Sequence, residues 1–159
     1  MIFVILGTHE LPFTRLLQEV ERLKKEGLIE DDIIVQSGHT KFETSHMKMV
    51  PFFNFEEMDR LFDEARLIIT HAGTGSVITG LKKGKKVIAA PRLEKYGEHN
   101  DDHQLQLTST FVEQEHILSW GDKEDLLELI HLAEAFNPKP FESKQQQMFS
   151  LLKQFIDES

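Results

Sequence analysis

Short apolar runs alternate along this chain with stretches in which apolar residues recur every three or four positions. The runs predict strands that are buried on both faces of a sheet, and the spaced positions predict amphipathic helices that cover it. Six runs fit strands: residues 2–6, 33–35, 47–53, 67–70, 87–91 and 117–118. The alternation of strand and helix predicts an α/β fold, a Rossmann-like, mostly parallel sheet with helices on both faces.

Five segments within this pattern fit helices: residues 12–27, 54–65, 76–83, 101–111 and 122–133. Asn54 is expected to cap the second helix, with Glu57 as its capping-box partner. Asp122 is expected to cap the fifth.

The segment 137–140, Asn-Pro-Lys-Pro, is the one linker-like stretch. Residues 143–157 beyond it again have the spacing of an amphipathic helix. The sequence therefore predicts a Rossmann-like domain over residues 1–136, followed by a linker and a C-terminal helix over residues 137–159.

Composition narrows the functional classes. The chain has 159 residues, a formal net charge of −9 and no cysteine, so it fits one domain of ordinary size. The negative charge argues against a protein that reads a nucleic-acid backbone. The lack of cysteine excludes disulfides and thiolate zinc sites. The first apolar run has no basic leader and is too short to span a membrane, which predicts a cytoplasmic protein.

The turn after the fourth run, His71 to Ser76, has the composition of an anion site. Gly73 and Gly75 allow a close backbone approach, and the following helix directs its unpaired N–H groups and partial positive charge into the turn. It is neither G-x-G-x-x-G nor a P-loop, so it predicts neither dinucleotide binding nor nucleoside triphosphate hydrolysis. A purely structural glycine turn is the alternative, although the hydroxyls of Thr74 and Ser76 favour an anion.

The expected topology directs attention to the same place. If the first three strands run outward one way and the next three the other, the switch point lies between the first and fourth strands. Ligands of such sheets bind there, beyond the carboxyl ends of the strands. The loops at that point are Gly7-Thr8-His9 and His71 to Ser76.

Other candidates have competing interpretations. His99 and His103 lie one helical turn apart and could bind a metal, but a solvated loop and helix cap is the commoner explanation. In a third interpretation, His103 and Gln104 donate hydrogen bonds to a sugar. Arg92 and Lys95 could meet phosphates, although solvated charges are more frequent.

Several motifs in the right order resemble a known group of enzymes. They are Ile69–Ser76, Gly84, Pro91 and Asp102–Gln104, together with the opening Phe3–Leu17 and Gln36–Gly38. The first four resemble the nucleotide-sugar-binding half of GT-B glycosyltransferases, in the group that contains the C-terminal domain of the peptidoglycan N-acetylglucosaminyltransferase and the Alg13-type subunit. The opening is similar to PssE-type capsule and exopolysaccharide glycosyltransferases. The resemblance covers nearly the whole chain.

The resemblance implies a UDP-sugar donor, inversion at the anomeric carbon, and no metal or other cofactor. It implies that Gly7 and Thr8 face the phosphates, and that the stretch Gly73, Thr74, Gly75 and Ser76 contacts the diphosphate and ribose. His103 and Gln104 match the pair that contacts the donor sugar. His71 either bonds backbone at the strand end or contacts the ligand directly.

One position departs from the resemblance. Thr79 stands where many relatives place an acidic residue for the ribose hydroxyls, and threonine offers no charged acceptor. The acceptor half of a GT-B enzyme also has no counterpart in these motifs. If the catalytic base lies on this chain, His9 is the first candidate, since imidazole titrates near working pH.

The leading hypothesis is a UDP-sugar-dependent inverting glycosyltransferase subunit, by resemblance a β-1,4-galactosyltransferase that acts on a lipid-linked acceptor in capsule or exopolysaccharide synthesis. It would work with a membrane-tethered acceptor-domain subunit, Alg14- or PssD-like, at the inner face of the membrane. Alternatives are an N-acetylglucosaminyltransferase subunit and a non-catalytic nucleotide-sugar-binding subunit.

Overall fold

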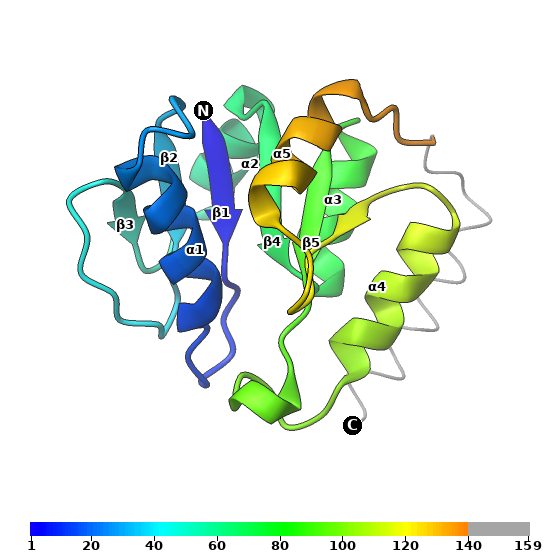
Figure 1. The fold of residues 1–159 in the computed structure, drawn as a ribbon, viewed down its shortest axis with the longest axis horizontal. Helices are drawn as coiled ribbons and strands as arrows, with labels where there is room; N and C mark the ends of the chain where they lie inside the picture. The colour runs from blue at the N-terminus through cyan, green and yellow to red at the C-terminus, as the bar shows by residue number, and fades with distance from the viewer. Residues whose placement is uncertain (140–159) are drawn as a thin grey trace.

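The computed structural model describes residues 1–139, which form one six-stranded, all-parallel sheet (Figure 1). Its strands are β1 (Ile2–Ile5), β2 (Ile33–Gln36), β3 (Lys48–Val50), β4 (Leu67–His71), β5 (Val87–Ala90) and β6 (Leu118–Ser119). Their order is β3-β2-β1-β4-β5-β6. The predicted α/β class, the parallel sheet and the switch point between β1 and β4 are confirmed.

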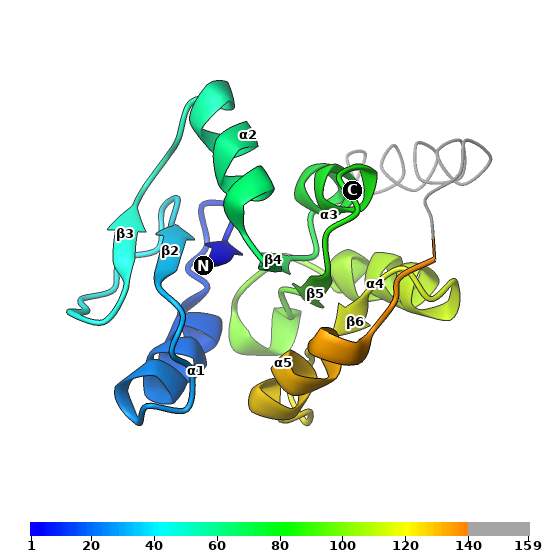
Figure 2. The same cartoon turned by 90° about the horizontal axis from the view of Figure 1, so that it is seen from above.

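Helices cover both faces of the sheet (Figure 2). They are α1 (Thr14–Lys25), α2 (Phe55–Glu64), α3 (Thr74–Lys82), α4 (His103–Glu113) and α5 (Leu126–Ala135), with a short 3-10 turn η1 (Glu94–Tyr96) after β5. The buried residues of α1 and α5 share one apolar core, and those of α2, α3 and α4 share the other. The predicted arrangement of helices on both faces is therefore confirmed.

The central strands are continuously apolar because both of their faces are buried. Along β1, Ile2 and Val4 pack into the core under α1 and α5, whereas Phe3 and Ile5 pack into the opposite core. Both faces are buried, so every position favours an apolar side chain. The register pairs Ile5 of β1 with Thr70 of β4, which brings the loops after these two strands together.

The capping residues that the sequence predicts are correct for one helix and wrong for another. Asn54 caps α2 as predicted, because its Oδ1 accepts a hydrogen bond from the Glu57 N–H at 2.8 Å. The predicted cap at Asp122 is wrong: Asp125 caps α5, with Oδ1 2.9 Å from the Leu127 N–H. Asp122 instead pairs with Lys95. Asp122 and Asp125 both precede the helix, and the residue at which α5 begins determines which of them can accept from its first N–H groups.

Helix α3 begins at Thr74, with Gly73 as its N-cap, two residues before the predicted start at Ser76. None of the helices in residues 1–139 is long and apolar enough to cross a membrane. The predicted C-terminal helix, residues 143–157, lies outside the described residues, so the division at residue 136 stays a prediction.

Candidate functional site

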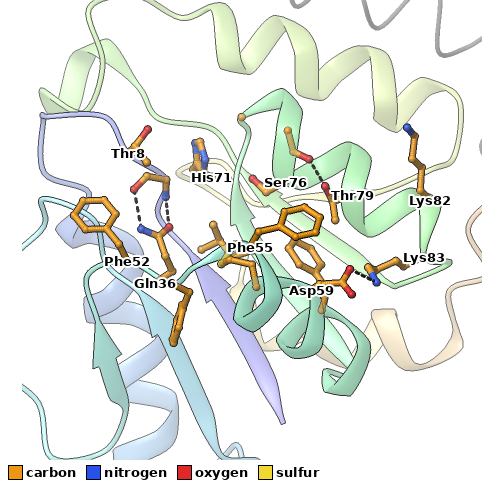
Figure 3. A pocket seen from close by; sticks show the side chains of 17 residues that line it. Thr8, Gln36, Phe52, Phe55, Asp59, His71, Ser76, Thr79, Lys82 and Lys83 are labelled. Atoms are coloured by element: carbon orange, nitrogen blue, oxygen red, sulfur yellow. Dashed lines mark hydrogen bonds and ion pairs between the residues drawn. The ribbon is translucent and has the colours of Figure 1, made fainter.

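A cleft of about 660 Å³ opens at the carboxyl edge of the sheet, between the loop after β1 and the helices α2 and α3 (Figure 3). One end is formed by polar and glycine positions: Gly7, Thr8, Gln36, His71, Gly73, Gly75, Ser76 and Thr79. The other end is largely apolar, and its charged lining residues are Asp59, Lys82 and Lys83. Parallel α/β sheets place their ligands at this edge.

The loop after β1 is held by a side chain from the neighbouring strand. Gln36, at the end of β2, accepts from the Gly7 N–H through Oε1 at 3.0 Å and donates to the Gly7 carbonyl through Nε2 at 3.1 Å. The same Nε2 also donates to the Pro51 carbonyl at 2.8 Å. The Gly7 peptide therefore has one fixed orientation. Its φ of +81° lies in the left-handed region that glycine tolerates best.

The His71 ring lies between two glycine backbones. A Cβ on Gly7 would be 2.4 Å from Nε2 of His71, and a Cβ on Gly73 would be 2.1 Å from Cε1. Only glycine at these two positions leaves room for the ring. On its inner side, Nδ1 of His71 lies 3.3 Å from Nε2 of Gln104. His71 is half-buried, and it lines the cleft between Thr8 and Ser76.

Burial and a neighbouring cation keep His71 neutral. Removal of the ring from water, followed by the positive charge of Arg92, lowers the pKa of His71 to about 3. An imidazole with this pKa carries no charge near neutral pH. It can donate or accept hydrogen bonds at the cleft but contributes no positive charge.

The start of α3 supplies the other side of the polar end. Gly73 is the N-cap of the helix and has no side chain that could accept from its first N–H groups. The first α-helical hydrogen bond runs from the Val77 N–H to the Gly73 carbonyl. The first N–H groups of a helix have no intrahelical acceptor, and they lie at its positive end. Ser76 Oγ lies 3.1 Å from Thr70 Oγ1, so the Ser76 hydroxyl also stands at this end of the cleft. This end of the cleft therefore suits an anion.

The far end of the cleft is aromatic. Phe52 and Phe55 are 52% and 84% exposed, so two phenylalanines stand in solvent at the mouth. Asp59 of α2 pairs with Lys83 at 2.8 Å across the cleft, as Figure 3 shows. Apolar rings beside a polar floor suit a ligand that is aromatic at one end and charged at the other.

Arg92 neither binds at the cleft nor faces solvent, contrary to both predicted alternatives. Its side chain is 1% exposed and donates to the backbone carbonyls of Leu6 at 2.8 Å, Leu11 at 2.7 Å and Glu98 at 3.0 Å. It therefore joins both ends of the loop after β1 to the loop after β5. Burial lowers its pKa to about 10, which leaves it charged.

Arg92 donates to the backbone carbonyl of Glu98, whereas the Glu98 carboxylate pairs with Arg15. Arg15 donates to both Glu98 oxygens, from Nε at 3.0 Å and from Nη2 at 3.1 Å. Arg15 also lies 4.6 Å from the centre of the Trp120 ring. These contacts tie α1 to the loop after β5 and fix the edge of the sheet next to the cleft.

His9 lies outside the lining of the cleft. Its Nδ1 accepts from the Leu11 N–H at 3.0 Å, and its ring packs on His99 with centroids 4.6 Å apart. Burial lowers its pKa, and so do the charges of His99 and Arg92. Because Nδ1 already accepts a hydrogen bond, the neutral ring carries its proton on Nε2 and presents a donor.

His99 and His103, for which metal binding is the less common interpretation, both contact a carboxylate. Nδ1 of His99 lies 3.1 Å and Nδ1 of His103 3.4 Å from the two oxygens of Asp101. Within residues 1–139, no three His, Cys, Asp or Glu side chains are grouped so as to hold a metal ion.

Comparison with known proteins assigns the chain to a family. Residues 1–158 match the glycosyltransferase family 28 C-terminal domain. The chain belongs to this family. It is also 26% identical, over 137 residues, to the UDP-N-acetylglucosamine transferase subunit ALG13 of Yarrowia lipolytica, covering 79% of this chain and 68% of that protein. The family and this relative place the chain among the glycosyltransferases.

Solved structures support the GT-B fold. An NMR structure of ALG13 superposes with a TM-score of 0.57 at 22% identity, over 95% of this chain and 93% of that one. MurG of Acinetobacter baumannii superposes with a TM-score of 0.54 at 17% identity, over 95% of this chain and 49% of MurG. The glycotransferase of kitacinnamycin gives 0.59 at 13% identity, over 96% of this chain and 38% of that enzyme. The chain thus spans half or less of these two enzymes.

The family 28 domain brings together most of the predicted binding residues. Gly7, Thr8, His71, Gly73, Gly75, Ser76 and Thr79 all line the cleft. Thr74, His103, Gln104 and His9 are not among the lining residues. Thr74 and Gln104 are buried, and the Gln104 amide bonds to His71 and to the Arg92 N–H.

Sequence reasoning missed several lining residues. Gln36 belongs to one of the motifs of the family resemblance, and its place in the site could have been predicted, since a polar side chain ends the second apolar run at the same edge of the sheet. Phe52 and Phe55 stand in segments whose patterns predict a strand end and a helix start, and nothing in the neighbouring sequence indicates that the two rings are exposed. The pairing of Asp59 with Lys83 joins α2 to the end of α3, so it could not be predicted before the positions of the two helices were known.

Proposed function

We propose that the chain is the donor-binding subunit of a UDP-sugar-dependent, inverting glycosyltransferase. One observation carries this proposal: a cleft at the switch point joins the Gly7–Thr8 loop to the start of α3 and ends in an exposed aromatic mouth. A nucleoside diphosphate has the matching distribution, with an anion at one end and an aromatic base at the other.

In this proposal the diphosphate lies between Gly7–Thr8 and Gly73–Ser76, where N–H groups and the Ser76 hydroxyl are available to it. The ribose lies along α3 at Thr79. The base lies toward Phe52 and Phe55. Thr79 Oγ1 donates to the Gly75 carbonyl at 2.8 Å, so its lone pairs, rather than its proton, would meet a ribose hydroxyl.

Two donor sugars have support. The similarity of the opening segment to PssE-type enzymes favours galactose, transferred in a β-1,4 linkage to a lipid-linked acceptor in capsule or exopolysaccharide synthesis. The ALG13 relative is a UDP-N-acetylglucosamine transferase subunit, which favours N-acetylglucosamine at least as strongly. Calorimetric titration of the chain with both donors separates the two, because a site shaped for one sugar binds that nucleotide sugar more tightly than the other.

We propose that a membrane-tethered partner of the Alg14 or PssD type supplies the acceptor side and holds this chain at the inner face of the membrane. The match to about half of MurG supports a second, acceptor-binding half. The Nδ1 lone pair of His9 is taken by the Leu11 N–H. We therefore place the catalytic base on the partner. If the base lies on this chain instead, His9 is the candidate.

Turnover by the reconstituted complex tests that assignment. A His9→Ala variant that binds donor and keeps wild-type turnover places the base elsewhere. A variant that binds donor and loses turnover makes His9 catalytic. We also propose that no metal is required, so turnover in EDTA should equal turnover in buffer. Loss of activity that Mg²⁺ or Mn²⁺ restores would refute this.

The binding proposal is tested by titrating the chain with UDP in EDTA. A Cβ at Gly75 meets nothing within 4 Å, and this residue lines the cleft, so Gly75→Val places two methyl groups in the binding space without disturbing the fold. We expect micromolar binding by the wild type and at least tenfold weaker binding by the variant. Leu132→Val, at an exposed position of α5 on the opposite side of the sheet, is the control. Equal affinity in all three proteins would place UDP elsewhere.

A further inference from the structure

The Gln104 side chain has a fixed amide orientation. It is 6% exposed, and one of its two terminal atoms lies 3.0 Å from the Arg92 backbone N–H. A backbone N–H can only donate, so the atom that faces it is the oxygen, Oε1. The amide nitrogen, Nε2, is therefore the atom that faces Nδ1 of His71 at 3.3 Å.

This orientation determines which nitrogen of His71 carries the proton. An amide nitrogen is a donor and has no lone pair to offer, so Nδ1 of His71 must accept. A neutral imidazole has one N–H, and its proton is then on Nε2. Burial and the nearby Arg92 charge disfavour the doubly protonated ring, so the Nε2–H tautomer is the form that the surroundings select.

The Nε2 atom lies at the polar end of the cleft. Hypothetical Cβ atoms on Gly7 and Gly73 would be 2.4 and 2.7 Å from it, so it sits between the two backbone segments assigned to the diphosphate. The hydrogen bond that residues 1–139 offer the His71 ring is the one between Nδ1 and Gln104, and His71 is half-buried where it lines the cleft. A donor is thus held at the place where an anion is proposed.

We propose that Gln104 is a positioning residue for the diphosphate site: it fixes His71 in the neutral tautomer that presents an Nε2–H donor to the ligand. The inference rests on the proposed function for the identity of the ligand but not for the tautomer. It differs from the role that the family resemblance implies for Gln104, because both ends of its amide are engaged inside the protein.

The arrangement has a physical advantage over a charged ring. Arg92, His9 and His99 all lie close enough to disfavour a positive charge on His71. A neutral donor binds a phosphate oxygen without that penalty, and it does not change charge near neutral pH. Gln104 supplies the orientation, since without its Nε2–H either ring nitrogen could carry the proton.

Gln104→Glu is the decisive variant. The carboxylate still accepts from the Arg92 N–H, but its second oxygen can only accept from His71. His71 must then protonate Nδ1, either by changing tautomer or by becoming charged. Gln106→Glu, two residues along α4 at an exposed position, is the control for the added charge.

Two measurements read out the change. Long-range ¹H–¹⁵N correlation spectra of the unliganded chain should show Nε2 protonated and Nδ1 unprotonated for His71 in the wild type and the control, and Nδ1 protonated in Gln104→Glu. Titration with UDP should show about tenfold weaker binding by Gln104→Glu alone, the loss expected for one hydrogen bond to a charged group.

Each outcome is decisive. A wild-type spectrum with Nδ1 protonated overturns the inference even if the variant does not fold. A changed tautomer with unchanged UDP affinity overturns the role of His71 as a donor to the diphosphate. Absence of UDP binding by the wild type, alone and with its partner, refutes the proposed function, while the spectrum still tests the tautomer.

Discussion

Replacing Gly73 with alanine tests whether the His71 ring is held between two backbone segments. The backbone of Gly73, at φ −74° and ψ 137°, is one that alanine adopts without strain. The new Cβ would lie 2.1 Å from Cε1 of His71, whereas carbon atoms pack at about 3.5–4.0 Å. The ring must therefore shift by about 1.5 Å, which breaks its contact with Gln104.

The cost follows from these changes. Loss of one buried hydrogen bond and a displaced side-chain torsion each cost on the order of 1 kcal/mol, so we expect Gly73→Ala to lower the free energy of unfolding by about 2 kcal/mol. Gly75→Ala is the matched control, two residues along the same turn. Its Cβ meets nothing within 4 Å, and alanine is favoured over glycine inside a helix by up to about 1 kcal/mol.

Urea unfolding followed by far-UV circular dichroism measures both variants. We expect a lower midpoint for Gly73→Ala and an equal or slightly higher one for Gly75→Ala. Gly73→Ala should also bind UDP more weakly, since the displaced ring no longer presents its donor. Equal midpoints for the two variants would refute the tight packing of His71 against Gly73.

Three further predictions concern stability. Arg92→Met leaves three backbone carbonyls without their donor and should cost about 2–4 kcal/mol in urea unfolding; an unchanged midpoint would contradict the joining of the two loops. Asp125→Ala should cost about 1 kcal/mol through loss of the α5 cap, and Asp122→Ala should cost less; the reverse order would contradict the assigned cap. Stability should fall as the pH drops from about 6.5 toward 3, because unfolded His71 takes up a proton that the folded ring excludes, at most about 1.4 kcal/mol per pH unit. Asp31, whose pKa its hydrogen bonds with Arg66 hold at about 2, adds to the loss below about pH 4; urea midpoints that stay level from pH 7 to 4 would contradict the assignment of His71, and midpoints with no further fall below pH 4 would contradict that of Asp31.

Most of the sheet could be predicted because its signal is local. Strands such as β1 and β4 are buried on both faces, so their sequences are continuously apolar and stand out from the helices. The switch point followed from strand order, and it correctly placed Gly7, Thr8 and the His71–Ser76 turn together. These are properties of short segments and of a topology with few alternatives.

The contacts that shape the site could not be predicted in the same way. Arg92 bonds to Leu6 and Leu11, which are more than 80 residues away in the sequence, and nothing near Arg92 distinguishes it from a solvated arginine. The two ends of the Gln104 amide likewise depend on the positions of β4 and β5. Such side chains acquire their roles only when the fold brings distant backbone groups to them.

The most direct test of the account is a titration of the ¹⁵N-labelled chain with UDP-N-acetylglucosamine or UDP-galactose, followed by backbone amide chemical shifts. If the cleft binds the donor, the largest shifts will occur at Gly7, Thr8 and the first turn of α3, residues 74–76, and the amides of α1 and α5 on the opposite face will stay in place. Shifts confined to that opposite face, or none in the presence of the partner, would contradict a donor site at the carboxyl edge of the sheet.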